Sequence, residues 1–233
     1  MLSSFWKFST AGNTTLFVER SPAAALGVID AEQAGIADFA AGSLTMAGGE
    51  FCANACLAYG AFSAMLARPA TQVIISGRQV RLRIEGSFPA WHCLAQFQFG
   101  DYRAEPSMDG VLCHLPGISH MLRQCETFPA GASVLAYAEE LAKIVPNPAA
   151  GLICWQRLAD GFAIMPAVAA PGAGTCNLEQ ACGSGTLALA SLFAGQKCRV
   201  RQPSGEILEA ELAGADAVLS GPVHFLAKGE IWL

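Results

Sequence analysis

Charged residues and long apolar runs are both scarce in this chain of 233 residues. Asp, Glu, Lys and Arg make up 14% of it, and hydrophobic residues make up 53%. Because an average domain has about 25% charged residues, we expect a large buried core. No stretch reaches the roughly 18 consecutive apolar residues of a membrane span, and the first residues lack the apolar core and cleavage site of a signal peptide. We therefore expect a cytoplasmic protein with no membrane partner.

Clusters of basic residues are also missing, and the formal net charge is −5. Nucleic-acid phosphates are bound by clustered Lys and Arg, so we expect no nucleic-acid partner. The nine cysteines are odd in number and scattered, which argues against a disulfide framework in an intracellular chain. Most of them are expected to be buried, free thiols.

An internal repeat is the main feature that is present. The stretches "CANACLAYGAF" from Cys52 and "CGSGTLALASL" from Cys182 both begin with Cys, a small residue, a hydrogen-bonding residue and another small residue, and both continue with Leu-Ala at the same offsets. Each is followed by two strand-like runs around a turn, "SGRQ" in the first case and "PSGE" in the second. The repeat therefore predicts two related halves.

The repeat predicts an α+β fold with two pseudo-symmetric halves, each a curved, mostly antiparallel sheet wrapped round a buried central helix. We place the first half at residues 1–115, with Cys52, and the second at 116–221, with Cys182. The last strand, 222–233, is expected to return to the first half. The stretches "GLICWQRL" and "GFAIMPAV" are predicted strands, and "ASVLAYAEELAKIV" is predicted to be an amphipathic helix.

A cysteine at the start of a helix has a distinctive chemistry. The first turn presents unpaired N–H groups and the positive end of the helix dipole, which together bind carboxylates. The same field favours the thiolate and moves a Cys pKa from about 8.5 toward roughly 3.5–7.5 in known cases. Two such helix starts facing one cleft would clamp a carboxylate and place one sulfur on each face of the attached carbon. That arrangement suits racemisation, in which one thiolate removes the Cα proton and the other thiol returns one.

Several motifs occur in one order from residue 8 to the end of the chain. They are Gly12-Asn13, Cys52-Ala53-Asn54-Ala55, Asn147-Pro148, Ala181-Cys182-Gly183-Ser184-Gly185-Thr186 and the final "GPVHFLAKGEIWL", in which a glycine turn separates two strands. In these residues the chain resembles the diaminopimelate epimerase-like family, cofactor-independent amino-acid racemases and epimerases with two pseudo-symmetric α/β halves. The resemblance implies that Cys52 and Cys182 are catalytic and that no cofactor or metal is used. It also implies substrate contacts from Asn13, Ala53, Asn54, Asn147, Gly183, Ser184, Gly185 and Thr186.

The substrate expectation comes from departures from the family pattern. Diaminopimelate epimerases have a Glu-Arg pair before the second Cys, where this chain has Ala173-Gly174. Their Asn-Pro-His motif corresponds here to Asn147-Pro148-Ala149, so the histidine is replaced by alanine. A distal carboxylate would lack its bidentate arginine. The stretches "GGEFCANA" and "EQAG" resemble the histidine racemase branch, which supplies D-histidine for opine-type metallophores. That likeness implies that Glu32 contacts the amine or side chain of the substrate.

Other interpretations stay open at this stage. Each motif cysteine could be a buried thiol that opens a packed helix, Glu32 a solvated carboxylate, and the asparagines caps or turn residues. Cys52 and Cys56 have zinc-ligand spacing, but no second pair accompanies them. The alternatives to a histidine racemase are a diaminopimelate epimerase with altered distal recognition and a non-catalytic amino-acid-binding protein. We expect a small-molecule amino-acid partner, with a homodimer as one option for the assembly.

Overall fold

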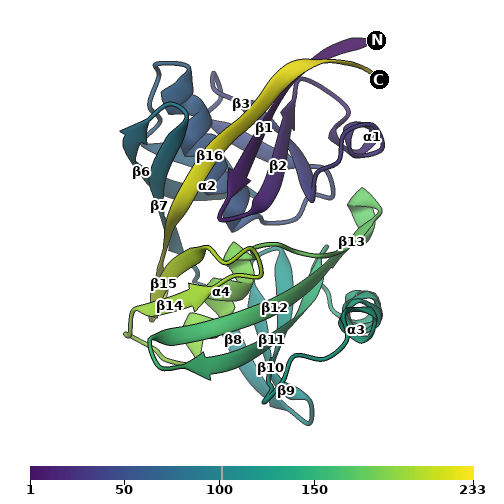
Figure 1. Cartoon of the computed structure of the whole chain (residues 1–233), viewed down its shortest axis with the longest axis vertical. Coiled ribbons are helices and arrows are strands. Elements are labelled where there is room, and N and C mark those ends of the chain that lie inside the picture. The colour runs from purple at the N-terminus through teal and green to yellow at the C-terminus, as the bar shows by residue number, and fades with distance from the viewer. Residues whose placement is uncertain (101) are drawn as a thin grey trace.

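The computed structural model describes residues 1–100 and 102–233, and it is strand-rich with few helices (Figure 1). The strands of the first part of the chain are β1 (Leu2–Thr10), β2 (Asn13–Val18), β3 (Gln33–Asp38), β4 (Ser43–Met46), β5 (Gln72–Ile75), β6 (Arg78–Ser87) and β7 (Ala90–Gln98). The later strands are β8 (Arg103–Ser107), β9 (Gly110–Leu115), β10 (Ile118–Gln124), β11 (Ala150–Leu158), β12 (Gly161–Ala170), β13 (Thr175–Leu178), β14 (Cys198–Arg201), β15 (Ile207–Ala213) and β16 (Asp216–Trp232). The helices are α1 (Pro22–Leu26), α2 (Ala53–Met65), α3 (Gly131–Ile144) and α4 (Gly183–Ser191), with a 3₁₀ turn at Pro171–Ala173.

One lobe is a closed ring of strands around α2. Strands β1 to β7 pair in sequence order, β7 pairs with β16, and β16 pairs back onto β1. Most of these pairings are antiparallel, whereas β2 with β3 and β4 with β5 are parallel. The ring has no free edge on this path, and it surrounds α2, which packs on β1, β6, β7 and β16.

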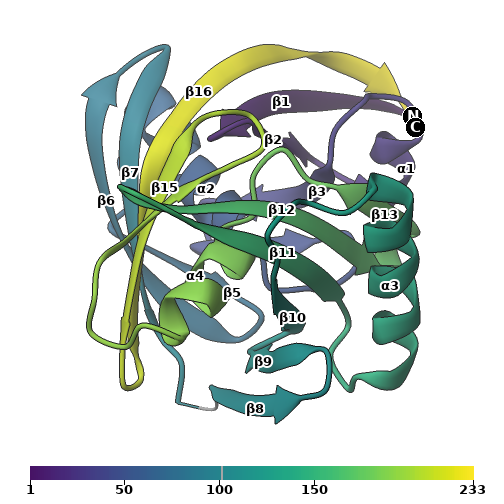
Figure 2. The same cartoon turned by 60° about the horizontal axis from the view of Figure 1, so that its bottom comes forward.

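The second lobe continues the same sheet from the other edge of β16. The order runs β16-β15-β14-β12-β11-β10-β9-β8, with β13 beside β12. Helix α4 packs against β15, β10 and β16, whereas α3 lies outside the sheet against β11, β12 and β13 (Figure 2). Strand β16, yellow in Figure 1, passes from the lower lobe to the upper one and so joins the two lobes.

The character of each helix follows from where it is packed. Nearly every residue of α2 and α4 is buried, which is why neither sequence has a polar face. Helix α3 has one buried face and exposes Glu140 and Lys143, so the predicted amphipathic helix is confirmed. The predicted hairpins around "SGRQ" and "PSGE" are confirmed as the antiparallel pairs β5–β6 and β14–β15. In the described residues, the helices are too short or too polar to cross a membrane.

The C-terminal segment differs from its prediction. We expected a glycine turn between two strands, but β16 runs without a turn from Asp216 to Trp232, and Gly229 pairs with Phe5 inside it. A Cβ at Gly229 would lie 2.8 Å from the Phe5 ring. The glycine therefore makes room for an aromatic side chain of the neighbouring strand, and it does not reverse the chain.

Candidate active site

Cys52 and Cys182 are the N-cap residues of the two buried helices. Cys52 has φ −128° and ψ 107°, and Cys182 has φ −130° and ψ 103°. Each sulfur accepts a hydrogen bond from the backbone N–H three residues later, Ala55 in α2 and Gly185 in α4, both at 3.3 Å. The sulfur thus occupies the position that a Ser or Asp oxygen usually takes at a helix start. The predicted helix start at each cysteine is correct.

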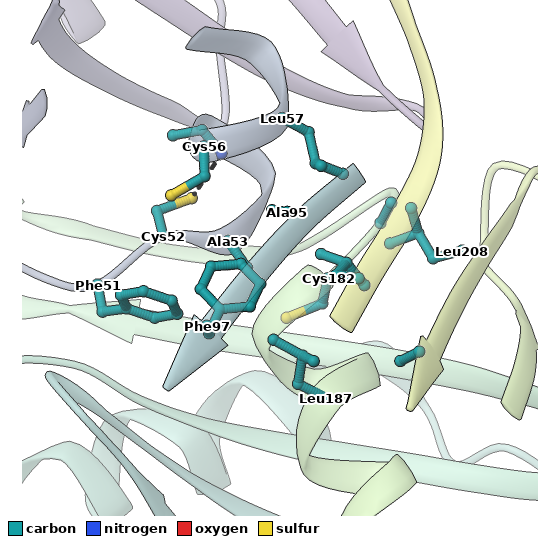
Figure 3. Close-up of a cluster of buried hydrophobic side chains, with 14 of the residues drawn as sticks. Phe51, Cys52, Ala53, Cys56, Leu57, Ala95, Phe97, Cys182, Leu187 and Leu208 are labelled. Carbon is teal, nitrogen blue, oxygen red and sulfur yellow. Dashed lines mark hydrogen bonds between the residues drawn. The ribbon is translucent and has the colours of Figure 1, made fainter. Parts of the chain in front are cut away.

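Both thiols line a single cavity between the two helix starts. Its volume is about 30 Å³, which is room for one water molecule. Figure 3 shows Cys52 and Cys182 on two different helices, with Phe51, Phe97 and Leu187 packed around them. The other lining residues are Glu32, Gln33, Glu50, Ala53, Asn54, Ile118, Val168, Ala170, Thr175, Asn177, Glu179, Gly183 and Ser184. The space between the walls is therefore much smaller than a typical ligand-binding pocket of about 300–1,000 Å³.

The two helix starts are held in close contact. The Nδ2 of Asn54 donates to the carbonyl of Ala181 at 2.9 Å, and the Thr10 hydroxyl donates to the Asn54 carbonyl at 3.2 Å. A Cβ on Gly183 would lie 2.6 Å from Asn54 Oδ1 and 3.1 Å from Ala53 Cβ. Only glycine permits this approach. The buried Oδ1 of Asn54 has no hydrogen-bond partner among the described residues, so it is an acceptor at the cavity wall.

The backbone before α4 is positioned by Gln202. Its Oε1 accepts from the Cys182 N–H at 3.0 Å, and its Nε2 donates to the Thr186 hydroxyl at 3.1 Å. The Thr186 hydroxyl in turn donates to the Cys182 carbonyl at 2.7 Å. These bonds satisfy the backbone N–H and C=O of Cys182 and the hydroxyl of Thr186. Of the first-turn amides, those of Ala55 and Gly185 bond to the cysteine sulfurs, and the others, which have no partner inside the helix, can bind a ligand.

The thiols do not have the lowered pKa expected from their position. Burial raises the pKa of Cys52 well above its ordinary value, the Ala55 N–H acts in the opposite direction, and the charges of Glu179 and Glu50 raise it further. Burial also raises the pKa of Cys182, as does Glu179, against the opposing effect of the Ser184 and Gly185 hydrogen bonds. The expected stabilisation of the thiolate is therefore outweighed in the closed cavity, because desolvation penalises the charged form.

Three glutamates, Glu32, Glu50 and Glu179, place carboxyl groups at the cavity. Glu179 is buried, and burial followed by the charge of Glu32 raises its pKa to about 8. Burial also raises the pKa of Glu32 and of Glu50. Among the described residues that line the cavity, none is Lys, Arg or His. A ligand with a cationic group is therefore favoured beside these carboxyl groups.

The predicted substrate-contacting residues separate into two groups. Those that line the cavity are Glu32, Ala53, Asn54, Gly183 and Ser184, while Asn13, Asn147, Gly185 and Thr186 lie outside its lining. Asn147 donates to the Leu115 carbonyl at 3.2 Å and to the Ser119 hydroxyl at 2.8 Å. Asn13 is fully buried, and neither its Oδ1 nor its Nδ2 has a partner among the described residues.

Glu32 connects the lobes and is not a solvated carboxylate. Its Oε2 accepts from the Thr14 N–H at 2.8 Å, and its Oε1 accepts from the Gln180 N–H at 2.6 Å. Gln180 is two residues before Cys182 in the sequence, so the carboxylate ties the first lobe to the second helix start. Both of its oxygens already accept a backbone hydrogen bond.

Sequence reasoning did not find four residues of the site. Glu50 and Glu179 each precede a motif cysteine by two or three residues, in "GEFC" and "EQAC", and this shared position was the available signal. Gln33 accepts a hydrogen bond from the Cys52 thiol at 2.9 Å, and His120 contacts Ser184 at 2.9 Å. No local pattern marks these two, because β3 and β10 bring them to the helix starts from elsewhere in the chain. In the described part of the chain, no group of three or more His, Cys, Asp or Glu is arranged to hold a metal ion.

Comparison with known proteins shows the fold. No family model matches the chain, and no curated protein matches its sequence. Among solved structures, a predicted epimerase from Pseudomonas aeruginosa matches with TM-score 0.66 and 11% identity over 99% of both chains. A hydroxyproline epimerase from Agrobacterium vitis, with bound trans-4-hydroxy-L-proline, matches with TM-score 0.62 and 11% identity over 99% of this chain and 91% of the other. A PhzF-family phenazine biosynthesis protein from Enterococcus faecalis matches with TM-score 0.60 and 15% identity over 100% of both chains.

These matches define the class of protein by its architecture. The chain has the mixed α/β fold of these epimerase and PhzF-family structures. Identities of 11–15% carry the fold alone, so the reaction and substrate of this chain rest on its own residues.

Proposed function

We propose that this protein is an amino-acid racemase or epimerase that works without pyridoxal phosphate and uses Cys52 and Cys182 as its acid–base pair. The observation that carries the proposal is that two cysteines cap two buried helices with matching geometry and line one cavity. The fold shared with racemases and epimerases supports it. We also propose that residues 1–115 and 116–221 are the two pseudo-symmetric halves, each contributing one cysteine.

The site supports the following course of reaction. The substrate carboxylate binds the first-turn amides of α2 and α4, where the helix dipoles favour negative charge. One sulfur, as thiolate, removes the Cα proton, and the other, as thiol, delivers a proton to the opposite face. The amides stabilise the charge that develops on the carboxylate when the Cα proton leaves. The cavity closes around the reacting carbon, which excludes water from a poorly acidic position.

Histidine is the favoured substrate, in a conversion of L-histidine to D-histidine for metallophore synthesis. The resemblance to the histidine racemase branch suggests it, and the three cavity glutamates support it, because they suit an ammonium or imidazolium group. The same glutamates would repel the distal carboxylate of diaminopimelate. Diaminopimelate epimerisation with altered recognition is the competing substrate hypothesis.

Proton NMR in D₂O tests the function and the substrate together. Reduced protein is mixed with L-histidine or, separately, with LL-diaminopimelate, and the Cα–H signal is followed. Loss of the histidine signal together with D-histidine on a chiral column is the expected result. Loss with diaminopimelate alone would overturn the substrate assignment, and retention of the signal across a wider amino-acid panel would overturn the racemase.

A non-catalytic amino-acid-binding protein is the second candidate, and one observation favours it. Burial raises the pKa of both cavity thiols, which opposes formation of the thiolate that racemisation requires. A protein of this kind would bind histidine in a calorimetric titration and leave its Cα–H signal unchanged in D₂O. The racemase requires that the signal disappear.

A further inference from the structure

The two cavity thiols have chemically different hydrogen-bond partners. The Cys52 thiol donates to Gln33 Oε1 at 2.9 Å. The Nε2 of Gln33 donates to the Thr15 hydroxyl at 2.7 Å, and the amide oxygen faces the sulfur. An oxygen acceptor pairs with a thiol and offers nothing to a thiolate. This arrangement therefore favours protonated Cys52.

Cys182 has a hydroxyl as its partner. Its sulfur lies 3.6 Å from Ser184 Oγ, and that oxygen lies 2.9 Å from His120 Nε2. A hydroxyl can accept from a thiol, or it can turn and donate to a thiolate. When His120 supplies an N–H to the Ser184 oxygen, the hydroxyl hydrogen is free to point at the sulfur. Ser184 thus has a hydrogen for a Cys182 thiolate, in contrast to Gln33 beside Cys52.

His120 is placed to act only on this side of the cavity. It is fully buried in β10 opposite Gly151 of β11, where a Cβ would lie 2.8 Å from the imidazole Nδ1. Burial lowers the pKa of His120 to about 3, so the ring is neutral at physiological pH. A neutral ring orients the Ser184 hydroxyl without adding a charge to the site.

The other titratable groups near the sulfurs do not reverse this difference. Glu179 faces Cys182 and shares a side-chain hydrogen bond with it, and as a carboxylate it raises the pKa of that thiol; its own pKa of about 8 leaves it largely protonated near neutral pH. Cys52 is subject to the charges of both Glu50 and Glu179 and to the neighbouring Cys56 thiol. Each sulfur also accepts one backbone N–H, so this contribution is equal on the two sides.

We propose that Cys182 carries the thiolate in the substrate-free enzyme, that Cys52 is then the thiol, and that Ser184 and His120 are positioning residues for Cys182. The inference rests on the proposed racemase function. Cys182 takes the Cα proton of the first enantiomer onto its sulfur, and the S–H bond of Cys52 breaks as its proton passes to the opposite face of the carbon. The product leaves Cys52 as thiolate and Cys182 as thiol, the form that converts the other enantiomer.

Ultraviolet titration of thiolate absorbance tests this order without any turnover. Full-length wild type, Cys52→Ser and Cys182→Ser are titrated under reducing conditions, so that the seven other cysteines cancel in the differences. The difference between wild type and Cys182→Ser gives the titration of Cys182, and the difference between wild type and Cys52→Ser gives that of Cys52. We expect Cys182 to titrate about one pH unit below Cys52. The same pH for both, or the reverse order, would overturn the proposal.

Substitution of Ser184 in the Cys52→Ser protein tests the role of the hydroxyl. Ser184→Ala should move the Cys182 titration upward by about one pH unit, because the donor is lost, and Ser184→Thr should restore it. Ser191→Ala is the matched control, since Ser191 is on the same helix and contacts Cys113 and the Ala188 carbonyl. A shift of equal size in Ser191→Ala would show a general structural effect and would overturn the assignment.

Exchange of the Cα–H in D₂O then distinguishes a failure of this thiolate assignment from a failure of the proposed racemase function. His120→Gln or Ser184→Ala should slow exchange about tenfold in Cys52→Ser, where Cys182 is the base, and by clearly less in Cys182→Ser. Equal slowing in both backgrounds would overturn the positioning role. If His120→Gln fails to fold, Ser184→Ala decides. No exchange in either background would contradict the racemase, while the thiol titrations would still decide which sulfur ionises first.

Discussion

The side-chain amide of Asn54, in the first turn of α2, donates a 2.9 Å hydrogen bond to the carbonyl of Ala181, the residue before Cys182. One cysteine turn is thus bonded to the other across 127 residues of sequence. The contact sets the spacing of the two helix starts and therefore of the two sulfurs. Asn54 acts between the lobes, in addition to lining the cavity.

Replacing Asn54 should affect both stability and activity. Asn54→Ala leaves the buried Ala181 carbonyl unpaired, so we expect the free energy of unfolding to fall by about 1–3 kcal/mol. The rate of racemisation should fall by more than this loss of stability alone would cause, because the spacing of the thiols is lost. Urea denaturation and the D₂O exchange assay measure the two effects. Gln79→Ala, on the exposed strand surface, is the control, and an equal loss of activity there would contradict the role of Asn54.

The two-thiol mechanism requires both cysteines. Cys52→Ser and Cys182→Ser should each lower the rate of racemisation by at least about 10²-fold, because an alcohol is a far weaker acid–base group than a thiol. The fold should survive, since serine also caps helices. Chiral chromatography and circular dichroism check the two statements. Cys113→Ser, at a buried thiol outside the cavity, should keep its activity, and full turnover by either cavity variant would exclude the mechanism.

The starts of α2 and α4 approach each other so closely at residue 183 that only glycine fits there. An alanine Cβ would meet Asn54 Oδ1 at 2.6 Å and Leu219 Cδ2 at 2.8 Å, so one helix start must shift. We expect Gly183→Ala to cost about 1–3 kcal/mol of stability and most of the activity. Gly27→Ala, where the nearest atom would lie 3.4 Å away and φ is −75°, should be neutral. A melting temperature for Gly183→Ala equal to that of Gly27→Ala would contradict the close contact.

The raised pKa of Glu179 predicts a pH dependence of stability. Burial favours the protonated carboxyl in the folded state, so folded protein holds this proton up to about pH 8, whereas the unfolded chain releases it near 4.5. The unfolded state then binds fewer protons, and the free energy of unfolding falls as pH rises through this window. His120, with a pKa lowered to about 3, has the opposite effect below about pH 6.5.

The measurement is therefore made between about pH 6.5 and 8, where the effect of Glu179 is separate from that of His120. We expect the unfolding free energy of wild type to decline over this range and that of Glu179→Gln to decline less. Denaturant titrations at four or five pH values give the slope. An identical slope in the two proteins would show that Glu179 is ionised throughout the range.

Local patterns explain what could be predicted about the site. Each motif cysteine is followed by small residues and an apolar run, and both the N-cap position and the hairpin after each helix depend on residues close in sequence. Gly229 shows the limit of this reasoning. A glycine in a strand signals a turn or a close approach, and only the pairing of β16 with β1 shows that the approach of Phe5 is the reason.

The amino-acid sequence alone predicts a thiol at the start of each of two buried helices, because capping and helix burial are encoded within a few residues of each cysteine. It also determined the strands and hairpins around them. Only the tertiary structure decided how each thiol behaves. Desolvation, the three cavity glutamates, and the unlike partners of Cys52 and Cys182 depend on residues that distant strands bring together, and electrostatic effects depend on distance in space and on burial.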